Sequence, residues 1–320
     1  MRYKYVPNAG IEISALTAGT WSIGGDRWGA APDPEGSAAA IRAMIDGGVN
    51  LIDTSPAYGE GVSEEIVGKA LKNGYRDKTL VATKFSRITG PNGTIIHDGS
   101  YANAIRECDA SLKRMGLDYI DLYIQHWPSP DYPIAETMGA LVDLKKAGKI
   151  RFVGLSNYNR EQVEEASKYV KVDFVQNQYS MLDETKEEYF RWCESQGIGV
   201  MTYGSLGGGL LTGAVRQMPD WDKSDFRLNF YGSFYKEPAF SKIMSLLKVL
   251  DQVAEAHGKP VAQVAINWST QKSFVSTAIC GASKVRKAEQ NCAAFQWVLG
   301  GEEMDAIDRA LRTLNLSQGK

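Results

Sequence analysis

The stretch Leu51-Ile-Asp-Thr-Ser-Pro-Ala-Tyr-Gly59 begins as a short apolar run and breaks into a Pro/Gly turn, with an acid at Asp53 and a phenol at Tyr58. Two later apolar runs end in Lys84 and in His126. Most runs of this kind are continuously apolar rather than alternating, which is typical of parallel strands buried on both faces. The C-terminal ends of such strands meet at one face of a barrel, so we expect these four side chains to converge.

Eight such runs alternate with amphipathic stretches, and this alternation predicts an α/β fold, a (β/α)8 TIM barrel. The predicted strands are Leu16–Trp21, Asn50–Asp53, Thr79–Lys84, Tyr119–His126, Phe152–Asn157, Phe174–Gln178, Gly199–Tyr203 and Ser276–Gly281. The predicted helices are Glu35–Asp46, Glu64–Lys72, Tyr101–Met115, Ile134–Ala147, Arg160–Tyr169, Thr185–Gln196, Phe240–Ala256, Pro260–Thr270, Ser283–Ala294 and Gly301–Leu314. An open doubly wound sheet is the alternative, but no G-x-G-x-x-G sequence follows the first strand.

Two segments stand outside this alternation. Tyr3–Ile13 is typical of an N-terminal β-hairpin around an Asn-Ala-Gly turn, which we expect to plug the barrel floor. Gly204–Ala239 is a long irregular insertion after the seventh strand, and a loop of that length in a compact domain is usually functional. Barrels commonly reach this size, so a single barrel domain is expected over residues 1–320.

Composition limits the partners that we expect. The net charge of −2 gives no field to attract nucleic acid or an anionic membrane, so a small-molecule substrate is expected. No apolar stretch approaches a membrane span and the polar start is no signal peptide, which predicts a cytoplasmic protein. The four cysteines show no CxxC spacing and are expected to be reduced and mostly buried. The sequence does not indicate the oligomeric state.

Polar residues end most of the predicted strands: Asp53, Lys84, His126, Ser156, Asn157, Gln178 and Tyr203, with Tyr58 one turn after Asp53. Taken singly, Asp53 could be a turn cap, Tyr58 a packed aromatic and Lys84 a solvated strand end. His126 is a stronger candidate, because the other two histidines, His97 and His257, lie in segments that look exposed. Polar groups at the ends of buried strands are costly to desolvate unless paired, so their joint occurrence indicates a site.

The four residues suggest acid catalysis. A lysine ammonium beside a phenol favours the phenolate, so Lys84 is expected to lower the pKa of Tyr58 while Asp53 keeps Lys84 charged. A neutral His126 could hydrogen-bond a substrate carbonyl while Tyr58 protonates the developing alkoxide. The sequence shows no Ser-His-Asp nucleophile pattern and no metal-ligand spacing, so no metal is expected. Proton delivery without either suits hydride transfer from a cofactor.

Glycines and cations after the last two strands indicate where a cofactor would bind. The loop Ser205-Leu-Gly-Gly-Gly-Leu-Leu-Thr-Gly213 follows the seventh strand, and Gly281-Ala-Ser-Lys-Val-Arg-Lys287 follows the eighth. In barrels these loops commonly form a phosphate site with a helix N-terminus. Glycines let the backbone approach a pyrophosphate, and Lys284, Arg286 and Lys287 supply positive charge. The alternative for each cation is a solvated helix face.

At these positions the chain resembles the aldo-keto reductase family, over nearly its whole length up to about Ala294. The resemblance rests on Gly48–Gly59 continuing through Ser63–Glu64 to Ile66–Leu71, on Thr83–Lys84, Gln125–Pro128, Gly154–Asn157 and Gln176–Tyr179, and on Tyr203 through Gly213. It departs from the family pattern at Gly204–Ser205, where Ser-Pro is frequent, and at Cys280, where proline is frequent.

The resemblance implies a role for each site residue. Tyr58 would be the general acid, Lys84 and Asp53 would tune it, and His126 would orient the carbonyl. The cofactor-binding residues would be Gly19, Thr20, Trp21, Asp53, Ser156, Asn157, Gln178, Tyr203, Gly204, Ser205, Leu206, Gly208, Leu210, Arg227, Gly281, Ser283, Lys284, Lys287, Gln290 and Asn291. The Ser283–Lys284 pair favours NADP(H), with NAD(H) possible. Trp21, Trp28, Tyr58, His126, Trp127 and the aromatic segment Phe226–Tyr235 would line the substrate side.

The implied activity is NADP(H)-dependent reduction of an aldehyde or ketone, or the reverse oxidation of a sugar or polyol hydroxyl. The aromatic mouth suits a sugar-like or aromatic carbonyl. Two alternatives remain. One is a nucleotide-binding regulatory subunit on the same fold, similar to potassium-channel β subunits. The other is a barrel lyase or isomerase without nicotinamide. It leaves unexplained Ser156, Asn157 and Gln178, which the resemblance implies would hold the carboxamide of a nicotinamide.

Overall fold

Parallel strands close into a barrel, as the alternation of the sequence predicts. The structure is a computed structural model that describes residues 1–25, 33–221 and 225–315. In ring order, the strands of the closed barrel are β10 (Phe174–Gln178), β11 (Gly199–Tyr203), β12 (Thr277–Gly281), β3 (Leu16–Gly19), β4 (Leu51–Asp53), β5 (Leu80–Phe85), β8 (Ile120–Gln125) and β9 (Ile150–Ser156). All eight predicted strands are present, and every pairing around the ring is parallel.

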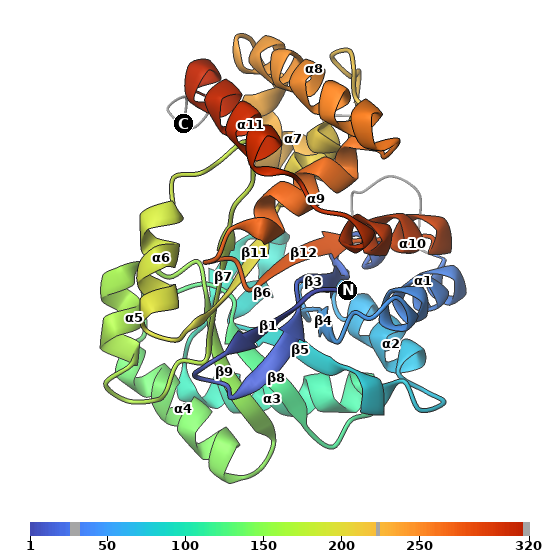
Figure 1. The fold of residues 1–320 in the computed structure, drawn as a ribbon. Coiled ribbons are helices and arrows are strands. Elements are labelled where there is room, and N and C mark those ends of the chain that lie inside the picture. The colour runs from blue at the N-terminus through green and yellow to red at the C-terminus, as the bar shows by residue number, and fades with distance from the viewer. Residues whose placement is uncertain (26–32, 222–224, 316–320) are drawn as a thin grey trace.

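Helices surround the strands (Figure 1). They are α1 (Pro34–Asp46), α2 (Val62–Ala70), α3 (Tyr101–Met115), α4 (Ile134–Lys146), α5 (Arg160–Ala166), α6 (Glu187–Ser195), α8 (Ala239–His257), α9 (Val261–Gln271), α10 (Val285–Ala293) and α11 (Gly301–Leu314). Several begin at a side-chain cap: Ser100 accepts a hydrogen bond from Asn103 N at the start of α3, and Asn159 forms a capping box with Gln162 on α5. Such caps satisfy backbone N–H groups that a helix leaves unpaired.

The N-terminal hairpin closes the barrel floor. Strands β1 (Tyr3–Val6) and β2 (Ile11–Ser14) pair antiparallel, as predicted. Val6 and Ile13 are fully buried in a cluster of residues inside the barrel, where they meet Leu51, Leu122 and Phe174. This cluster fills the lower barrel with apolar side chains, so polar chemistry is left to the opposite end, where the strands terminate.

Two segments differ from the prediction. A small hairpin, β6 (Arg87–Thr89) and β7 (Ile95–His97), follows β5 and was not predicted. The insertion 204–239 is partly helical rather than irregular: it contains η4 (Gly207–Thr212), α7 (Phe226–Tyr231) and η5 (Gly232–Tyr235). The Asp225 side chain caps α7 by accepting a hydrogen bond from Arg227 N, which fixes its start.

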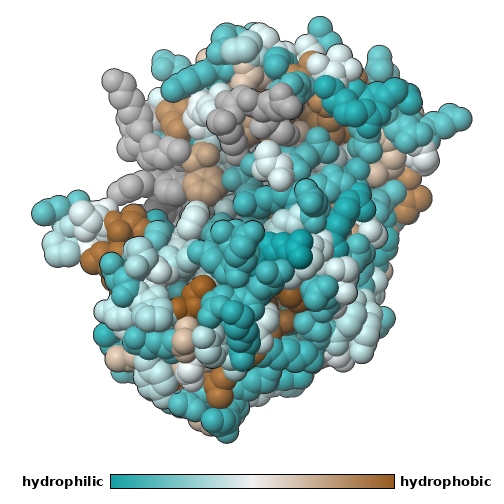
Figure 2. Space-filling view, turned by 90° about the vertical axis from the view of Figure 1, so that its left-hand side faces the viewer, coloured by the Kyte–Doolittle hydropathy of each residue, from teal (hydrophilic) through white to brown (hydrophobic). Residues whose placement is uncertain are grey.

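Within the described residues, no helix is long and apolar enough to cross a membrane. The face shown in Figure 2 is mainly hydrophilic, and its hydrophobic residues form small separate groups. The cysteines in the described chain are unpaired, and all are buried except the half-buried Cys292, in line with the expected burial.

Candidate active site

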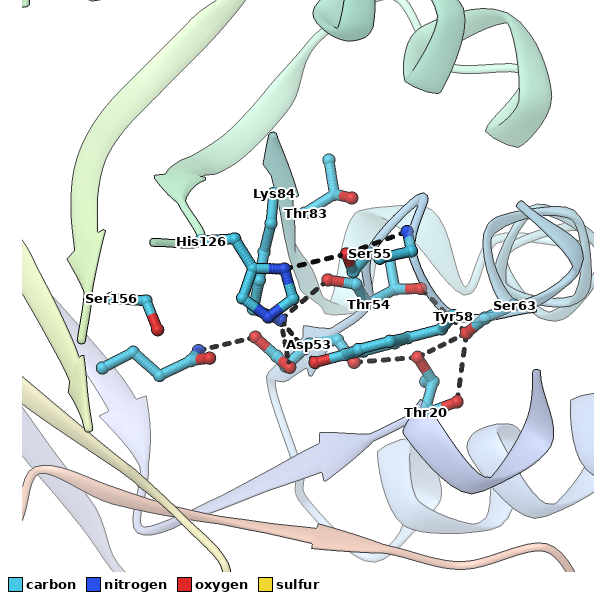
Figure 3. Close-up of polar contacts among 12 residues, drawn as sticks. Thr20, Asp53, Thr54, Ser55, Tyr58, Ser63, Thr83, Lys84, His126 and Ser156 are labelled. Carbon is cyan, nitrogen blue, oxygen red and sulfur yellow. Dashed lines mark hydrogen bonds and ion pairs between the residues drawn. The ribbon is translucent and has the colours of Figure 1, made fainter. Parts of the chain in front are cut away.

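Lys84 lies at the centre of the polar groups at the C-terminal end of the barrel. Its ammonium donates to Asp53 Oδ1 at 2.7 Å, to the Thr54 carbonyl at 2.9 Å and to the Tyr58 hydroxyl at 3.1 Å (Figure 3). The side chain is fully buried. An ammonium has three N–H groups and no acceptor, so all three donors are used. The Tyr58 oxygen therefore accepts from Lys84, which leaves the Tyr58 proton free to be donated elsewhere.

The protonation of Tyr58 differs from the expectation. Lys84 was expected to lower the pKa of Tyr58 below its ordinary value. Lys84 does act in that direction, but burial of the phenol acts more strongly, and the net pKa of Tyr58 is raised. Burial alone would lower the pKa of Lys84, but the charge of Asp53 and the contact with Tyr58 outweigh it, so that pKa is raised too. At neutral pH the pair is a charged lysine and a phenol that carries its proton.

Asp53 is held on both of its carboxylate oxygens. While Oδ1 accepts from Lys84, Oδ2 accepts from Gln176 Nε2 at 2.7 Å. Its backbone carbonyl accepts from both Thr20 N and the Thr20 hydroxyl. A buried carboxylate needs partners of this kind to offset its desolvation. Gln176 was not among the predicted site residues, and Thr20 supports Asp53 through a fully buried side chain.

His126 faces Tyr58 across the site. The two rings are 6.0 Å apart between centroids and nearly perpendicular. Burial is the main reason that the pKa of His126 lies well below its ordinary value, and Lys84 and Arg87 add to the effect. The imidazole is therefore neutral at neutral pH. Ser55 Oγ lies 3.4 Å from Nδ1 and already accepts from Ala57 N, so its proton can go to Nδ1, which favours an N–H on Nε2.

Aromatic side chains surround Tyr58 at the mouth. Trp21 stacks on the Tyr58 ring at 6.0 Å, and Phe230 on α7 meets Trp21 edge-on at 5.5 Å. Trp21 was expected at a strand end but lies in the short η1 helix (Trp21–Ile23). Trp127 stacks on His97 at 5.6 Å, so His97 is half-buried rather than exposed as expected. Trp28 lies outside the described residues.

Three of the predicted cofactor-binding side chains end consecutive strands of the ring. Ser156 ends β9, Gln178 ends β10 and Tyr203 ends β11. Asn157 follows β9 with a positive φ of 61°. Its amide is already engaged, because Oδ1 accepts from the Tyr203 hydroxyl at 2.8 Å and Nδ2 donates to the His126 carbonyl at 3.0 Å. The strand ends thus bring these residues to the same end of the barrel as Tyr58.

The glycine-rich loop after β11 turns tightly. Gly204, Gly207, Gly208 and Gly209 all have positive φ. A Cβ on Gly208 would lie 2.5 Å from the ring of the buried Tyr231 on α7, so only glycine fits there. The other predicted residues of this loop are Ser205 and Leu210, which are buried, and Leu206, which is half-buried.

The predicted residues after β12 are mostly on the surface. Gly281, Ser283, Lys284, Lys287 and Gln290 are exposed, whereas Asn291 is buried and donates to the Gly281 carbonyl at 3.4 Å. Gly19 ends β3 and pairs with Gly281 at the end of the neighbouring strand β12. Arg227 is bound within its own loop: two of its nitrogens donate to Asp225, and its guanidinium lies 3.6 Å from the Trp221 ring centroid.

Beneath the candidate catalytic residues lies a second layer of hydrogen bonds that was not predicted from the sequence. Ser63 donates to Thr20 and lies 2.9 Å from the Thr54 hydroxyl, all three being fully buried. Ser63 and Thr54 lie in or near the stretch that carries Asp53 and Tyr58. The sequence contains no pattern, however, that predicts a contact between their hydroxyl groups. Among the described residues, no group of three or more His, Cys, Asp or Glu side chains could hold a metal ion.

Comparison with known proteins places this site in a family. The model described as the aldo/keto reductase family matches residues 15–312. This chain belongs to the aldo/keto reductase family. As a member of it, the protein is an oxidoreductase, and the resemblance noted in the sequence is confirmed.

Curated and solved relatives of this aldo/keto reductase cover almost all of the chain. The aldo-keto reductase YhdN of Bacillus subtilis (strain 168) is 37% identical over 314 residues, which cover 97% of this chain and 94% of the relative. The NADH-specific methylglyoxal reductase of Escherichia coli (strain K12) is 34% identical, over 89% of this chain and 90% of its own. The structure of a glycerol dehydrogenase from Gluconobacter oxydans matches with a TM-score of 0.88 and 33% identity, over 97% and 95% of the two chains.

A further solved relative was crystallised with a nucleotide. An aldo-keto reductase from Klebsiella pneumoniae in complex with NADPH matches with a TM-score of 0.75 and 28% identity, over 97% of this chain and 95% of its own.

Proposed function

We propose that this aldo/keto reductase reduces an aldehyde or ketone to the alcohol with NADP(H), and that Tyr58 delivers the proton. The observation that carries the proposal is the geometry of Tyr58: its oxygen accepts from Lys84 at 3.1 Å, so its own proton is available to a substrate. The reverse oxidation of a sugar or polyol hydroxyl uses the same groups with the proton moving back to Tyr58.

The polar end of the barrel and its glycine loop fit a nicotinamide dinucleotide. The positive φ angles of Gly207, Gly208 and Gly209 and the lack of room for a Cβ at Gly208 make a loop whose backbone a pyrophosphate can approach. Ser156, Gln178 and Tyr203 would hold the nicotinamide end beside Tyr58. When bound, the dinucleotide supplies the hydride that reduces the carbonyl carbon.

The side chains of this protein then manage the proton and the carbonyl oxygen. An N–H on His126 Nε2 would hydrogen-bond the oxygen and direct it toward Tyr58. As negative charge develops on that oxygen, Tyr58 releases its proton to it, and Lys84 stabilises the phenolate left behind. Asp53 keeps Lys84 charged, and Gln176 keeps Asp53 in place.

Charge around α10 favours NADP(H) over NAD(H). Lys284 and Lys287 are exposed next to Ser283, and neither forms an ion pair within the described chain. Free cations there would suit the additional phosphate of NADP(H). Both coenzymes appear among the relatives, since one is named an NADH-specific methylglyoxal reductase and the structure of another was solved with NADPH.

The names of the relatives also bear on the substrate. Methylglyoxal and glycerol are small and polar, and these names favour a short carbonyl or polyol as the substrate class of this chain. A regulatory subunit on the same fold would need nucleotide binding but not an acid with a free proton, and the hydrogen-bond pattern at Tyr58 favours the enzyme.

Replacing Tyr58 with phenylalanine tests the proposed acid. The purified Tyr58→Phe protein should bind NADPH with unchanged affinity, measured by fluorescence, because the phenol oxygen is proposed to contact Lys84 and the substrate carbonyl rather than the coenzyme. Its kcat with aldehydes and ketones, followed by loss of NADPH absorbance, should fall about 10²- to 10⁴-fold. Full turnover by the variant would refute Tyr58 as the proton donor, and absence of binding of either coenzyme to the wild-type protein would refute the enzyme itself.

A further inference from the structure

Arg87 lies at the active-site mouth, on the small hairpin that follows the strand of Lys84. Only Phe85 and Ser86 separate it from Lys84 along the chain. Hydrogen bonds fix the turn at Ser86. Its N–H donates to the Glu107 carboxylate at 2.7 Å, and its carbonyl accepts from Asp98 N at 2.8 Å. Its hydroxyl donates to the Trp127 carbonyl at 3.1 Å and accepts from Trp127 N at 3.4 Å. The start of β6 is therefore held against the segment that carries His126 and Trp127.

The side chain of Arg87 is on the face of the hairpin that meets the site. Arg87 pairs directly with His97 across β6 and β7, and directly opposed residues share a face of a sheet. The His97 ring stacks on Trp127, the residue after His126, so this shared face lies against the mouth. The positive charge of Arg87 also acts on Tyr58 and lowers the pKa of His126, which places the charge close to both reacting groups.

Arg87 has no hydrogen-bond or ion-pair partner among the described residues. Among the half-buried arginines that the structure describes, it alone makes no hydrogen bond or ion pair. Its nitrogens are not sealed from solvent, since they are absent from the buried polar atoms that lack a partner. A half-buried guanidinium at such a place is partly desolvated without compensation, and its planar fork matches a carboxylate or phosphate.

The position of Arg87 assigns it to the substrate rather than to the coenzyme. The ring order runs β11, β12, β3, β4, β5, so β5 lies directly across the barrel from β11. The glycine loop and Tyr203 belong to β11, whereas Arg87 follows β5. A dinucleotide bound along the β11 and β12 loops would have its phosphates on the far side of Tyr58 from Arg87.

We propose, building on the reductase function above, that Arg87 binds an anionic group of the substrate, and that the physiological substrate is a short aldehyde or ketone bearing a carboxylate or phosphate a few bonds from the carbonyl. With the carbonyl oxygen between Tyr58 and His126, the anionic end points to the β6–β7 hairpin. Arg87 acts through binding and orientation and takes no part in proton transfer.

Matched pairs of substrates test this assignment. The kcat/KM of the wild-type and Arg87→Met proteins is measured with 4-oxobutanoate against butanal, and with glyceraldehyde 3-phosphate against glyceraldehyde, which distinguishes carboxylate from phosphate. Loss of a charge-assisted bond should lower kcat/KM for the anionic member about ten- to hundredfold, mainly through KM, and leave the neutral member within about threefold. Arg87→Lys should restore part of the loss.

Two further measurements separate this inference from the proposed reaction. Lys248→Met removes an exposed charge on α8 that has no partner in the described structure, and it should leave both members of each pair unchanged. Calorimetric titration with succinate needs no turnover, and binding should weaken in Arg87→Met. If neither carbonyl of a pair is reduced but succinate binding depends on Arg87, the reductase proposal fails and the anion site stands.

The anion site would be overturned if Arg87→Met lowered kcat/KM equally for charged and neutral substrates. It would also be overturned if the substitution left the affinity for succinate unchanged. The proposal would also be overturned if the wild-type protein had equal kcat/KM for the two members of each pair, that is, for butanal and 4-oxobutanoate and for glyceraldehyde and its 3-phosphate. The first of these results would mean that Arg87 acts only on Tyr58 and His126 through its field.

Discussion

Every N–H of the buried Lys84 ammonium has a fixed acceptor at this site. A buried lysine and aspartate pair is weak evidence for stability, because the cost of desolvating both charges can exceed their attraction. Here each charge has further partners: Lys84 also bonds Thr54 and Tyr58, and Asp53 also bonds Gln176. The arrangement is therefore better explained by the need to set the direction of the Tyr58 proton than by a need for stability.

The convergence of Asp53, Lys84 and His126 could be predicted, because each ends an apolar run and parallel strands of a barrel end together. Gln176 could not be predicted in the same way. It reaches Asp53 from β10, which lies across the ring from β4, and the two residues are 123 positions apart. Only closure of the barrel makes them neighbours. The raised pKa of Tyr58 also depends on burial, which the sequence does not state.

The neutral state of His126 has a consequence for stability at acid pH. In the unfolded chain a histidine gains its proton below about pH 6.5, whereas folded His126, with its lowered pKa, stays neutral to lower pH. The unfolded state then binds more protons, so the free energy of unfolding falls as pH drops below about 6.5 and is unaffected above it. His126→Gln should remove this loss, which is at most about 1.4 kcal/mol per pH unit.

Urea unfolding of wild-type and His126→Gln proteins from pH 5 to pH 8 measures the effect. The two curves should run parallel from pH 7 to 8, which serves as the internal control, and diverge below pH 6.5. Parallel curves over the whole range would mean that the folded protein protonates His126 as readily as the unfolded chain does.

At the scale of elements, the loop after β11 and the helix α7 depend on each other. The sequence showed the glycines of this loop but not the helix that packs on them, because α7 is short and starts at a cap, Asp225, within a stretch without clear periodicity. The β6–β7 hairpin escaped prediction for a similar reason. Its strands have three residues each, too few to establish alternation.

Replacing single glycines of the loop tests this packing. Gly208 and Gly209 both have positive φ, so an alanine strains the backbone at either position. A Cβ at Gly208 would meet the Tyr231 ring at 2.5 Å, whereas one at Gly209 meets nothing within 4 Å. Gly208→Ala should therefore lower the free energy of unfolding by about 1 kcal/mol or more in excess of the decrease caused by Gly209→Ala, which is the matched control. Urea unfolding measures both, and equal losses would show that α7 yields to the added methyl.

At the scale of the whole molecule, the ring of strands divides the mouth into two sides. Most residues proposed for the dinucleotide lie on or after β9 to β12, whereas Tyr58, Lys84, His126 and Arg87 lie on or after β4, β5 and β8. The barrel itself could be predicted from the regular alternation of the sequence, as could this division, because both follow from strand order. The loops that cover the mouth could not, since their conformation depends on contacts between distant segments.

This division predicts that coenzyme preference can be changed without touching the catalytic side. A ligand that binds only the folded protein raises its free energy of unfolding by about 2.7 kcal/mol at a hundred times its Kd. NADPH should stabilise the wild-type protein more than NADH at equal concentration, because only NADPH carries the additional 2′-phosphate that Lys284 and Lys287 would bind. The double variant Lys284→Met/Lys287→Met should lose most of that difference and keep the NADH effect. Thermal unfolding with each coenzyme measures this, with Lys242→Met/Lys248→Met on α8 as the control for net charge; an unchanged preference in the first double variant would place the phosphate contact elsewhere.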